Sequence, residues 1–332
     1  MKMGIMRLAW VAIVAIVAAG CAERREYVTV DGAMLGTTFH IVAQTDMGAA
    51  ELFERVMEVD AESKGSMSLF EPTSLLSRIN RGEEDRLDSH LLHNIAVAER
   101  IYTLSNGIYD ITVKPLTEAY GFAAKGRIEN PNIDSLLQFV GFDKMRITEG
   151  RIVKDDARLQ LDLNSLAKGY TVDLVAGLLE SRGVENYIVE IGGEIRCRGV
   201  NARGGAWRIG VDTPFDGNDR PGEYRQHIIR LGDRALATSG NYRRFYTDAA
   251  GRKVVHTINP RTGLSCSSRL LSATVVAPKC VEADAMATMF MAMGDSAAVE
   301  LASTMRDSVQ VYFILAPKGE ENEFEIFSTL EE

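Results

Sequence analysis

Two residues in the segment 283–288 have side chains that could hold a metal ion. Asp284 and Thr288 lie four residues apart, so in a helix the carboxylate and the hydroxyl face the same side. Both are hard oxygen ligands of the kind that suits Mg²⁺, which takes few protein ligands together with phosphate and water. The same pattern also fits an acid favoured by the helix dipole and a threonine packed in the core.

A second stretch, 162–173, follows a strand-like run at 158–161 and opens a helix. Asn164 or Ser165 could cap its first turn. A helix start attracts anions because its dipole and its free N–H groups act together. Lys168 lies in this turn, where a cation opposes the dipole. Its presence indicates either an anionic ligand that offsets this cost or a solvated surface lysine.

The five histidines give no clear hydrolytic or zinc site. Ser239 lacks the full nucleophile-elbow pattern, and nothing in the sequence pairs it with His256. No histidine pair has zinc-ligand spacing near a carboxylate motif. A hydrolytic triad is therefore not supported by the sequence.

Hydrophobic periodicity and turn residues predict the strands and helices that must position these side chains. Strands are expected at 28–30, 37–43, 145–148, 151–153, 158–161, 187–191, 207–211, 227–231, 235–238, 271–277 and 308–315. Helices are expected at 49–59, 89–105, 133–140, 166–182, 281–293 and 297–305, and a short turn or helix at 74–80. We also expect a turn at 31–32, a bulge at Gly36 and a tight turn at 192–193. At both glycine positions, a close approach of the backbone to a ligand is the alternative.

The composition is that of a globular protein. The chain has 332 residues, 46% hydrophobic and 25% charged, enough for one large domain or two closely packed ones. A net charge of −9 argues against nucleic acid as the main partner. Apart from Cys21, the cysteines at 197, 266 and 280 form neither a disulfide framework nor a zinc signature, although one disulfide stays possible.

The N-terminus resembles a lipoprotein signal. Lys2 and Arg7 precede an apolar run at 8–19, and small residues stand directly before Cys21, with Ala18 where a larger aliphatic residue is usual. We expect a signal peptide at 1–20, a lipidated Cys21 in a tether at 21–27, and one globular unit at 28–332. An ordinary cleaved signal peptide is the alternative.

Eight short motifs, in order along the chain, resemble those of the ApbE family, the FAD:protein FMN transferases. They lie at 34–37, 74–80, 109–116, 162–173, 191–194, 237–240, 256–263 and 283–288. Each motif alone is weak, whereas the ordered set spans nearly the whole mature chain. Leu35, Asn259 and Tyr120 depart from the methionine, aspartate and tryptophan that are common in the family.

The resemblance implies an α+β, T-fold-like architecture of mixed sheets with packed helices. It implies Mg²⁺ held by Asp284, Thr288 and a main-chain oxygen of Ser165. It places the flavin nucleotide at Leu35, Phe70, Ile108, Tyr109, Asp110, Asp162, Lys168, His256 and Ile258. The catalytic residues would be Asp284, Lys168 and His256, the last as general base for the acceptor hydroxyl; a structural hydrogen bond is the alternative for His256.

The implied reaction splits FAD, releases AMP and attaches FMN to a threonine or serine of a membrane redox subunit, such as one of Na⁺-translocating NADH:quinone reductase. The lipid anchor would hold the protein in a bacterial cell envelope, at a periplasm-facing membrane. Two alternatives stay open. The same site could split FAD with water as acceptor, or the protein could be a lipoprotein that only binds flavin.

Overall fold

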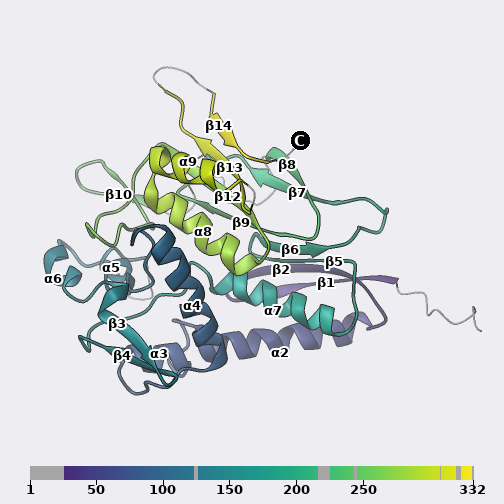
Figure 1. Ribbon diagram of the computed structural model, residues 1–332, viewed down its shortest axis with the longest axis horizontal. Coiled ribbons are helices and arrows are strands. Elements are labelled where there is room, and N and C mark those ends of the chain that lie inside the picture. The colour runs from purple at the N-terminus through teal and green to yellow at the C-terminus, as the bar shows by residue number, and fades with distance from the viewer. Residues whose placement is uncertain are drawn as a thin grey trace, which may run out of the picture.

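The computed structural model describes residues 26–122, 126–215, 225–242, 245–306, 308–318 and 323–330. The expected signal peptide, Cys21 and most of the tether lie outside these ranges. A large sheet runs through the molecule, and helices cover one of its faces (Figure 1). The expected mixture of strands and packed helices in one unit is therefore confirmed.

The main sheet has eight strands in the order β1-β2-β5-β6-β9-β12-β13-β14, and every neighbouring pair is antiparallel. Its strands are β1 (Glu26–Met34), β2 (Thr37–Thr45), β5 (Tyr187–Ile191), β6 (Glu194–Arg198), β9 (Ala235–Gly240), β12 (Leu270–Ala277), β13 (Gln310–Leu315) and β14 (Glu325–Ser328). Three hairpins stand apart from it: β3 (Met145–Thr148) with β4 (Arg151–Lys154), β7 (Trp207–Asp212) with β8 (Arg225–Leu231), and β10 (Phe245–Thr247) with β11 (Lys253–Val255).

The helices gather on one face of this sheet. They are α2 (Ala49–Met67), α3 (Leu75–Asn80), α4 (Ser89–Leu104), α5 (Lys114–Ala119), α6 (Ile133–Leu137), α7 (Ala167–Ser181), α8 (Cys280–Met293) and α9 (Asp295–Thr304), with a short 3₁₀ turn at Phe142–Lys144. In Figure 1, α7 and α8 lie in front of the sheet, α2 runs below α7, and α4 stands where α7 and α8 converge.

Along the central strands, successive side chains point to opposite faces of the sheet, and both faces are buried. In β13, Phe313 packs into the core beneath α8, whereas Tyr312 and Ile314 pack against the hairpin β7–β8 on the other face. A further core lies between β1, β2 and β5 and the helices α2 and α7. The start of α7 and the middle of α8 are thus held against a rigid layer.

Two tight hairpin turns meet at one end of the sheet. Leu35 and Gly36 join β1 to β2 with φ values of 50° and 75°, and Gly192 and Gly193 join β5 to β6 with φ values of 61° and 98°. Positive φ at both positions is the pattern of a type I′ turn. A Cβ at Gly192 would lie 2.7 Å from Cγ2 of Thr37, so the two turns are side by side.

Several sequence expectations about this region were wrong. The segment 31–32 is not a turn, because β1 continues through it, and Gly36 is part of the hairpin turn rather than a bulge. β1 begins at Glu26, so the last two residues of the expected tether belong to the sheet. The tight turn at 192–193 is confirmed.

The segment 158–161 is not a strand, which corrects another expectation. The side chain of Asn80 donates to the carbonyl oxygen of Leu161 at 2.9 Å and accepts from its N–H at 2.7 Å. One amide side chain thereby supplies the two bonds that a neighbouring strand would have made. The segment therefore joins no sheet.

Helix α2 is longer than its hydrophobic pattern predicts. Beyond Val59 the helix buries polar residues: Asp60 accepts from Lys64 at 2.6 Å, and Ser63 shares a hydrogen bond of 3.0 Å with Thr171 of α7. A polar face that is buried and paired carries no signal of hydrophobic periodicity. Within the described ranges, no helix is long and apolar enough to cross a membrane.

Candidate active site

Helix α7 begins at Ala167 and receives its capping acceptor from another helix. Leu166 is the N-cap residue and makes no side-chain cap, so the expected cap from Asn164 or Ser165 was wrong. The N–H of Gly169 donates instead to Oδ2 of Asp284, on α8, at 3.0 Å. The negative charge that the start of α7 favours is therefore supplied by the chain itself.

The two helices can approach this closely because position 169 has no side chain. A Cβ there would lie 2.4 Å from the carbonyl oxygen of Cys280 and 2.8 Å from Cβ of Asp284. Such distances are well inside van der Waals contact, so only glycine fits the crossing. The glycine thus sets the position of the Asp284 carboxylate.

Lys168 is paired within the chain. Its ammonium forms an ion pair with Glu194, the first residue of β6, which contradicts the solvated-surface interpretation. Burial by itself would lower the pKa of Lys168, but the charges of Glu194 and Asp284 outweigh it and the pKa is raised. Lys168 therefore remains a cation between two acids.

Both acids are buried, and burial disfavours their charged forms. Burial raises the pKa of Glu194 to about 7 against the opposing effect of Lys168, and it also raises the pKa of Asp284. The second oxygen of Glu194, Oε2, is buried and has no hydrogen-bond partner among the described residues. This concentration of charge is the arrangement expected where a charged ligand binds.

Ser165 and Tyr109 meet in front of the same helix start. The hydroxyl of the buried Tyr109 lies 2.8 Å from Oγ of Ser165. Asp162 shapes the preceding turn, since its Oδ1 accepts from the N–H of Asn164 at 2.9 Å and its Oδ2 accepts from the hydroxyl of Thr117 at 3.1 Å. Three predicted site residues are thus close together in the structure.

Asp110 has a structural role in this loop. Its Oδ1 accepts from the N–H and the hydroxyl of Thr112, at 2.8 and 2.7 Å, and its Oδ2 accepts from the N–H of Phe142 at 2.8 Å. The carboxylate is buried, and burial raises its pKa although these hydrogen bonds oppose the shift. Its oxygens hold the turn beside Tyr109, and a flavin contact at this position remains a prediction.

Thr288, one turn after Asp284 on α8, lies beside strand β9. Its hydroxyl is 3.2 Å from Oγ of Ser239. Two residues further on, the side chain of Asn241 accepts from Thr257 at 3.0 Å. These polar contacts connect the metal-ligand candidate on α8 to the loop that contains His256.

The ring of His256 packs edge-on against Phe122, with 6.2 Å between the ring centroids. From the same loop, Arg261 donates to the carbonyl oxygen of Asn106, just before Ile108. Ile258 is buried and packs beside Leu116. These contacts bring the loop 256–263 up to the segment that contains Tyr109.

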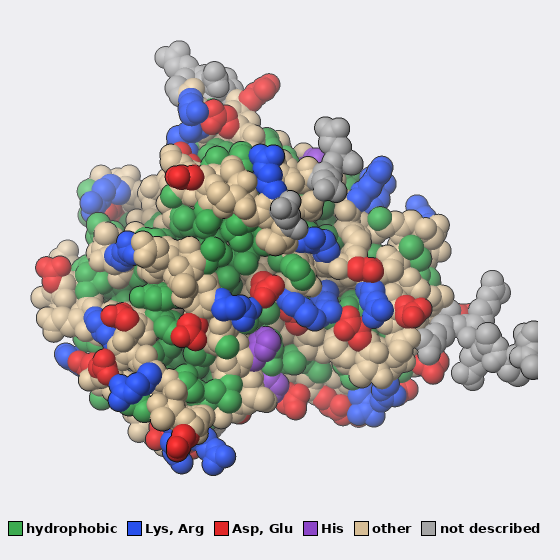
Figure 2. All heavy atoms as spheres, in the orientation of Figure 1, with side chains coloured by type: hydrophobic (Ala, Val, Ile, Leu, Met, Phe, Trp, Pro, Cys, Tyr) green, Lys and Arg blue, Asp and Glu red, His purple; other side chains and the backbone are tan. Residues whose placement is uncertain are grey.

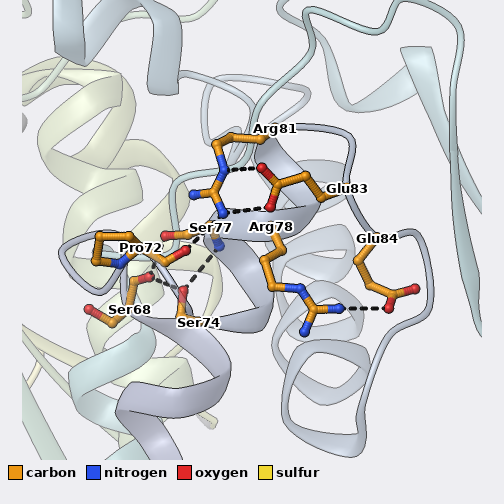
Figure 3. Close-up of polar contacts among 8 residues, drawn as sticks. All are labelled: Ser68, Pro72, Ser74, Ser77, Arg78, Arg81, Glu83 and Glu84. Carbon is orange, nitrogen blue, oxygen red and sulfur yellow. Dashed lines mark hydrogen bonds and ion pairs between the residues drawn. The ribbon is translucent and has the colours of Figure 1, made fainter.

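Phe70 belongs to a short loop that is fixed by hydroxyl groups. Figure 3 shows three of the residues involved, Ser68, Ser74 and Ser77. Oγ of Ser68 accepts from the N–H groups of Phe70 and Glu71, at 3.1 and 3.2 Å, and its carbonyl accepts from the hydroxyls of Ser74 and Ser77, at 2.5 and 3.1 Å. The side chain of Phe70 is 63% exposed. An exposed aromatic ring on a fixed loop is suited to stacking on a planar ligand.

Arg81 also binds this loop, because it donates to the carbonyl oxygen of Pro72 at 2.8 Å. Figure 3 shows this arginine paired with Glu83. Leu35 lies in the hairpin turn between β1 and β2, and its N–H donates to Asp60 on α2 at 3.3 Å. The structure thus groups Tyr109 with Ser165 and Lys168 with Asp284. Leu35 and Phe70 lie on separate loops, without a contact to that group among the bonds described.

Glu194 is the functional candidate that sequence reasoning did not single out. It belongs to the motif 191–194, but only its glycines suggested function. Its role becomes visible only from the tertiary pairing with Lys168. An acid directly after paired glycines was the one available signal.

The residues present fit a magnesium ion. Asp284 uses one carboxylate oxygen for Gly169, and the other has no hydrogen-bond partner in the described part of the chain. Thr288 offers a hydroxyl and Ser165 a main-chain oxygen, which suits an ion that keeps water and phosphate as further ligands. Among the described residues, no group of three or more His, Cys, Asp or Glu is arranged to bind a metal; the predicted set contains one such residue.

Charges of both signs lie on the helical face of the molecule. Figure 2 shows basic and acidic side chains intermixed over the helical face, without a broad patch of one sign. Many of these charges are paired, as Arg100 on α4 with Glu282 on α8 at 2.7 Å.

Comparison with solved structures defines the class of protein. The flavin transferase ApbE from Vibrio cholerae matches with a TM-score of 0.79 and 32% identity, over 91% of this chain and 97% of the other. The apo form of the Pseudomonas stutzeri flavinyl transferase ApbE matches with a TM-score of 0.79 and 26% identity, over 91% and 94%. The fold is that of the flavin transferases.

Sequence comparison agrees. The model of the ApbE family matches residues 35–313. A FAD:protein FMN transferase from Vibrio cholerae is 35% identical over 294 residues, 86% of each chain, and one from Haemophilus influenzae is 31% identical over 313 residues, 90% of this chain and 89% of that protein. The chain belongs to the ApbE family, which confirms the resemblance seen in its motifs.

Proposed function

We propose that the protein is a Mg²⁺-dependent FAD:protein FMN transferase that releases AMP. The proposal depends on one observation: Lys168, Glu194 and Asp284 lie together at the start of α7. The contact between Ser165 and Tyr109 lies beside them. A cation and a metal-binding carboxylate at one point are what a pyrophosphate substrate requires. The names of the relatives support the same reaction.

In this reaction the acceptor hydroxyl oxygen attacks the phosphorus of the FMN half of FAD. The bond from that phosphorus to the bridging oxygen breaks, AMP leaves with the electron pair, and the hydroxyl proton passes to a base. Such transfers depend on positioning and electrostatics rather than on covalent help from the protein. When bound, Mg²⁺ would neutralise negative charge on the pyrophosphate.

The residues of the chain have separate tasks in this proposal. Asp284, Thr288 and the main-chain oxygen of Ser165 would hold the ion. Lys168 would pair with a phosphate oxygen, and His256 would accept the proton, since imidazole titrates near neutral pH. The remaining predicted contacts would bind the flavin nucleotide: Leu35, Phe70, Ile108, Tyr109, Asp110, Asp162 and Ile258.

Incubation of the purified protein with FAD, Mg²⁺ and a candidate acceptor tests the reaction. Flavin fluorescence that stays on the acceptor after denaturation, together with one AMP per flavin, is expected. Free AMP without bound flavin would identify a FAD pyrophosphatase instead. The absence of both products, under conditions where FAD binds, would leave a flavin-binding protein and refute the transferase.

Substitutions on α8 test the metal ligands. Asp284→Ala should abolish metal-dependent AMP release, and Thr288→Val should impair it although the shape is nearly kept, because only a hydroxyl can coordinate. Thr288→Ser should retain part of the activity. Turnover measured against Mg²⁺ concentration, with melting curves as the control for folding, would refute the site if Asp284→Ala and Thr288→Val both behaved as wild type.

We further propose that the protein is anchored by a lipid on Cys21 to a periplasm-facing membrane, where its acceptor is a threonine or serine of a membrane redox subunit such as those of Na⁺-translocating NADH:quinone reductase. The small residues before Cys21 support the anchor. The chain from Ala22 onward, made without residues 1–21, should be found in the soluble fraction with unchanged FAD turnover, whereas the full-length protein should be found in the membrane fraction. Retention in the membrane fraction would contradict the anchor.

A further inference from the structure

Helix α8 begins without a cap of its own. Its N-cap residue, Lys279, makes no side-chain hydrogen bond to the first turn. The N–H of Val281 donates instead to Oδ2 of Asp173, on α7, at 3.0 Å. An acid in this position satisfies a free donor and complements the dipole of α8.

The other oxygen of Asp173 is bound by a largely buried arginine. Nη1 of Arg196, on β6, donates to Oδ1 of Asp173 at 2.9 Å, and its Nη2 donates to Glu180, near the end of α7, at 2.8 Å. The side chains of Arg196 and Asp173 are each 11% exposed. Glu180 is held in turn by the hydroxyl of Tyr187 at 2.6 Å. Asp173 thus connects α7, α8 and the main sheet.

Asp173 stabilises the same contact between α7 and α8 that positions Asp284. Gly169 and Asp173 are four residues apart and face the same side of α7, while Val281 and Asp284 are three apart on α8. Two hydrogen bonds therefore join the helices, one from Val281 to Asp173 and one from Gly169 to Asp284. A shift of α8 along α7 would break both bonds together.

We propose that Asp173 is a positioning residue for Asp284: by binding the first turn of α8 while Arg196 holds it to β6, it fixes where the Asp284 carboxylate lies. The inference rests on the proposed role of Asp284 as a metal ligand. Residues that orient a ligand in this way commonly contribute strongly to metal affinity. Asp173 itself is not among the predicted metal ligands or flavin contacts.

The test measures metal binding directly. Mn²⁺ is titrated into purified protein, and free Mn²⁺ is followed by electron paramagnetic resonance, with Mg²⁺ as competitor. Asp173→Ala removes both contacts and should raise the dissociation constant of Mn²⁺ by about 10-fold. Asp173→Asn keeps an oxygen that can accept from Val281 and should give a smaller rise. Asp284→Ala should bind no Mn²⁺ at this site.

Glu180→Gln is the matched control, because it weakens the same arginine network without touching α8. It should lower the melting temperature, as Asp173→Asn does, while Mn²⁺ binding stays as in wild type. Equal loss of Mn²⁺ affinity in Glu180→Gln and Asp173→Asn would show that a general loss of stability lowers the affinity. That result would overturn the inference. So would wild-type affinity in folded Asp173→Ala. Absence of Mn²⁺ binding in the wild type would refute the metal site itself, and with it this inference.

Discussion

Replacing Gly169 by alanine should both disable the site and destabilise the fold. The added Cβ would lie 2.4 Å from the carbonyl oxygen of Cys280. Relief of this clash requires α7 and α8 to separate by roughly 1 Å, since non-bonded atoms prefer about 3.5 Å or more. The hydrogen bond from Gly169 to Asp284, now 3.0 Å long, would then exceed the range of a hydrogen bond.

The magnitudes follow from these distances. Alanine gains ~1 kcal/mol of helix propensity over glycine, while overpacking costs ~1–3 kcal/mol and the lost bond to a charged acceptor ~1.5–3 kcal/mol. The net loss in the free energy of unfolding is then roughly 1.5–5 kcal/mol. A displacement of Asp284 by roughly 1 Å should lower AMP release about 100-fold.

Gly177→Ala provides the control on the same helix. A Cβ at Gly177 meets no atom within 4 Å, so this substitution should raise the free energy of unfolding by ~0.5–1 kcal/mol and leave turnover unchanged. Urea unfolding and AMP release, measured for both variants with saturating FAD and Mg²⁺, compare the two positions. If Gly169→Ala behaved like Gly177→Ala in both assays, the close helix crossing would not determine the position of Asp284.

Three further predictions concern the surroundings of the site. Lys168→Ala should abolish AMP release and, because it leaves Glu194 buried without its cation, lower the free energy of unfolding by ~1–3 kcal/mol; wild-type stability in urea would contradict the pairing. The folded-state pKa of Glu194, about 7, lies above its ordinary value. The protonated carboxyl therefore stabilises the fold at low pH, and this contribution is lost as pH rises through 7. In urea unfolding, Glu194→Gln should lose less stability than wild type between pH 5 and 8. Ser74→Ala removes the cap of α3 and a donor to the carbonyl of Ser68; it should cost ~1 kcal/mol and raise the KM for FAD with little change in kcat, and an unchanged KM would show that the Phe70 loop is held by other contacts.

Hydrophobic periodicity predicted most of the helices and central strands because these elements bury one side against a common core. It failed where polar groups take the place of apolar ones. The second half of α2 buries Asp60 and Ser63 through hydrogen bonds, and the segment 158–161 uses the side chain of Asn80 as its strand partner. Such pairings join residues that are distant in sequence, so no local pattern reveals them.

The candidate site was predictable in its residues but not in its electrostatics. Spacing along one helix placed Asp284 and Thr288 on one face, and a cation at a helix start marked Lys168. The sequence could not show that Asp284 itself occupies the start of α7, nor that Glu194 balances Lys168. Both contacts join separate elements of the fold, and each depends on a glycine: one on Gly169 at the helix crossing, the other on the turn before β6.

These contacts change the argument for anion binding at α7. The N–H of Gly169 is already bound to Asp284, and the charge of Lys168 is already balanced by Glu194. With both acids ionised, the three side chains carry one net negative charge, which repels a pyrophosphate. A divalent cation on Asp284 would reverse that sign. We therefore expect FAD to bind much more tightly with Mg²⁺ than without it, as measured by flavin fluorescence, and this difference to disappear in Asp284→Ala. Equal affinity for FAD with and without Mg²⁺ in the wild type would show that the start of α7 and Lys168 hold the phosphates unaided.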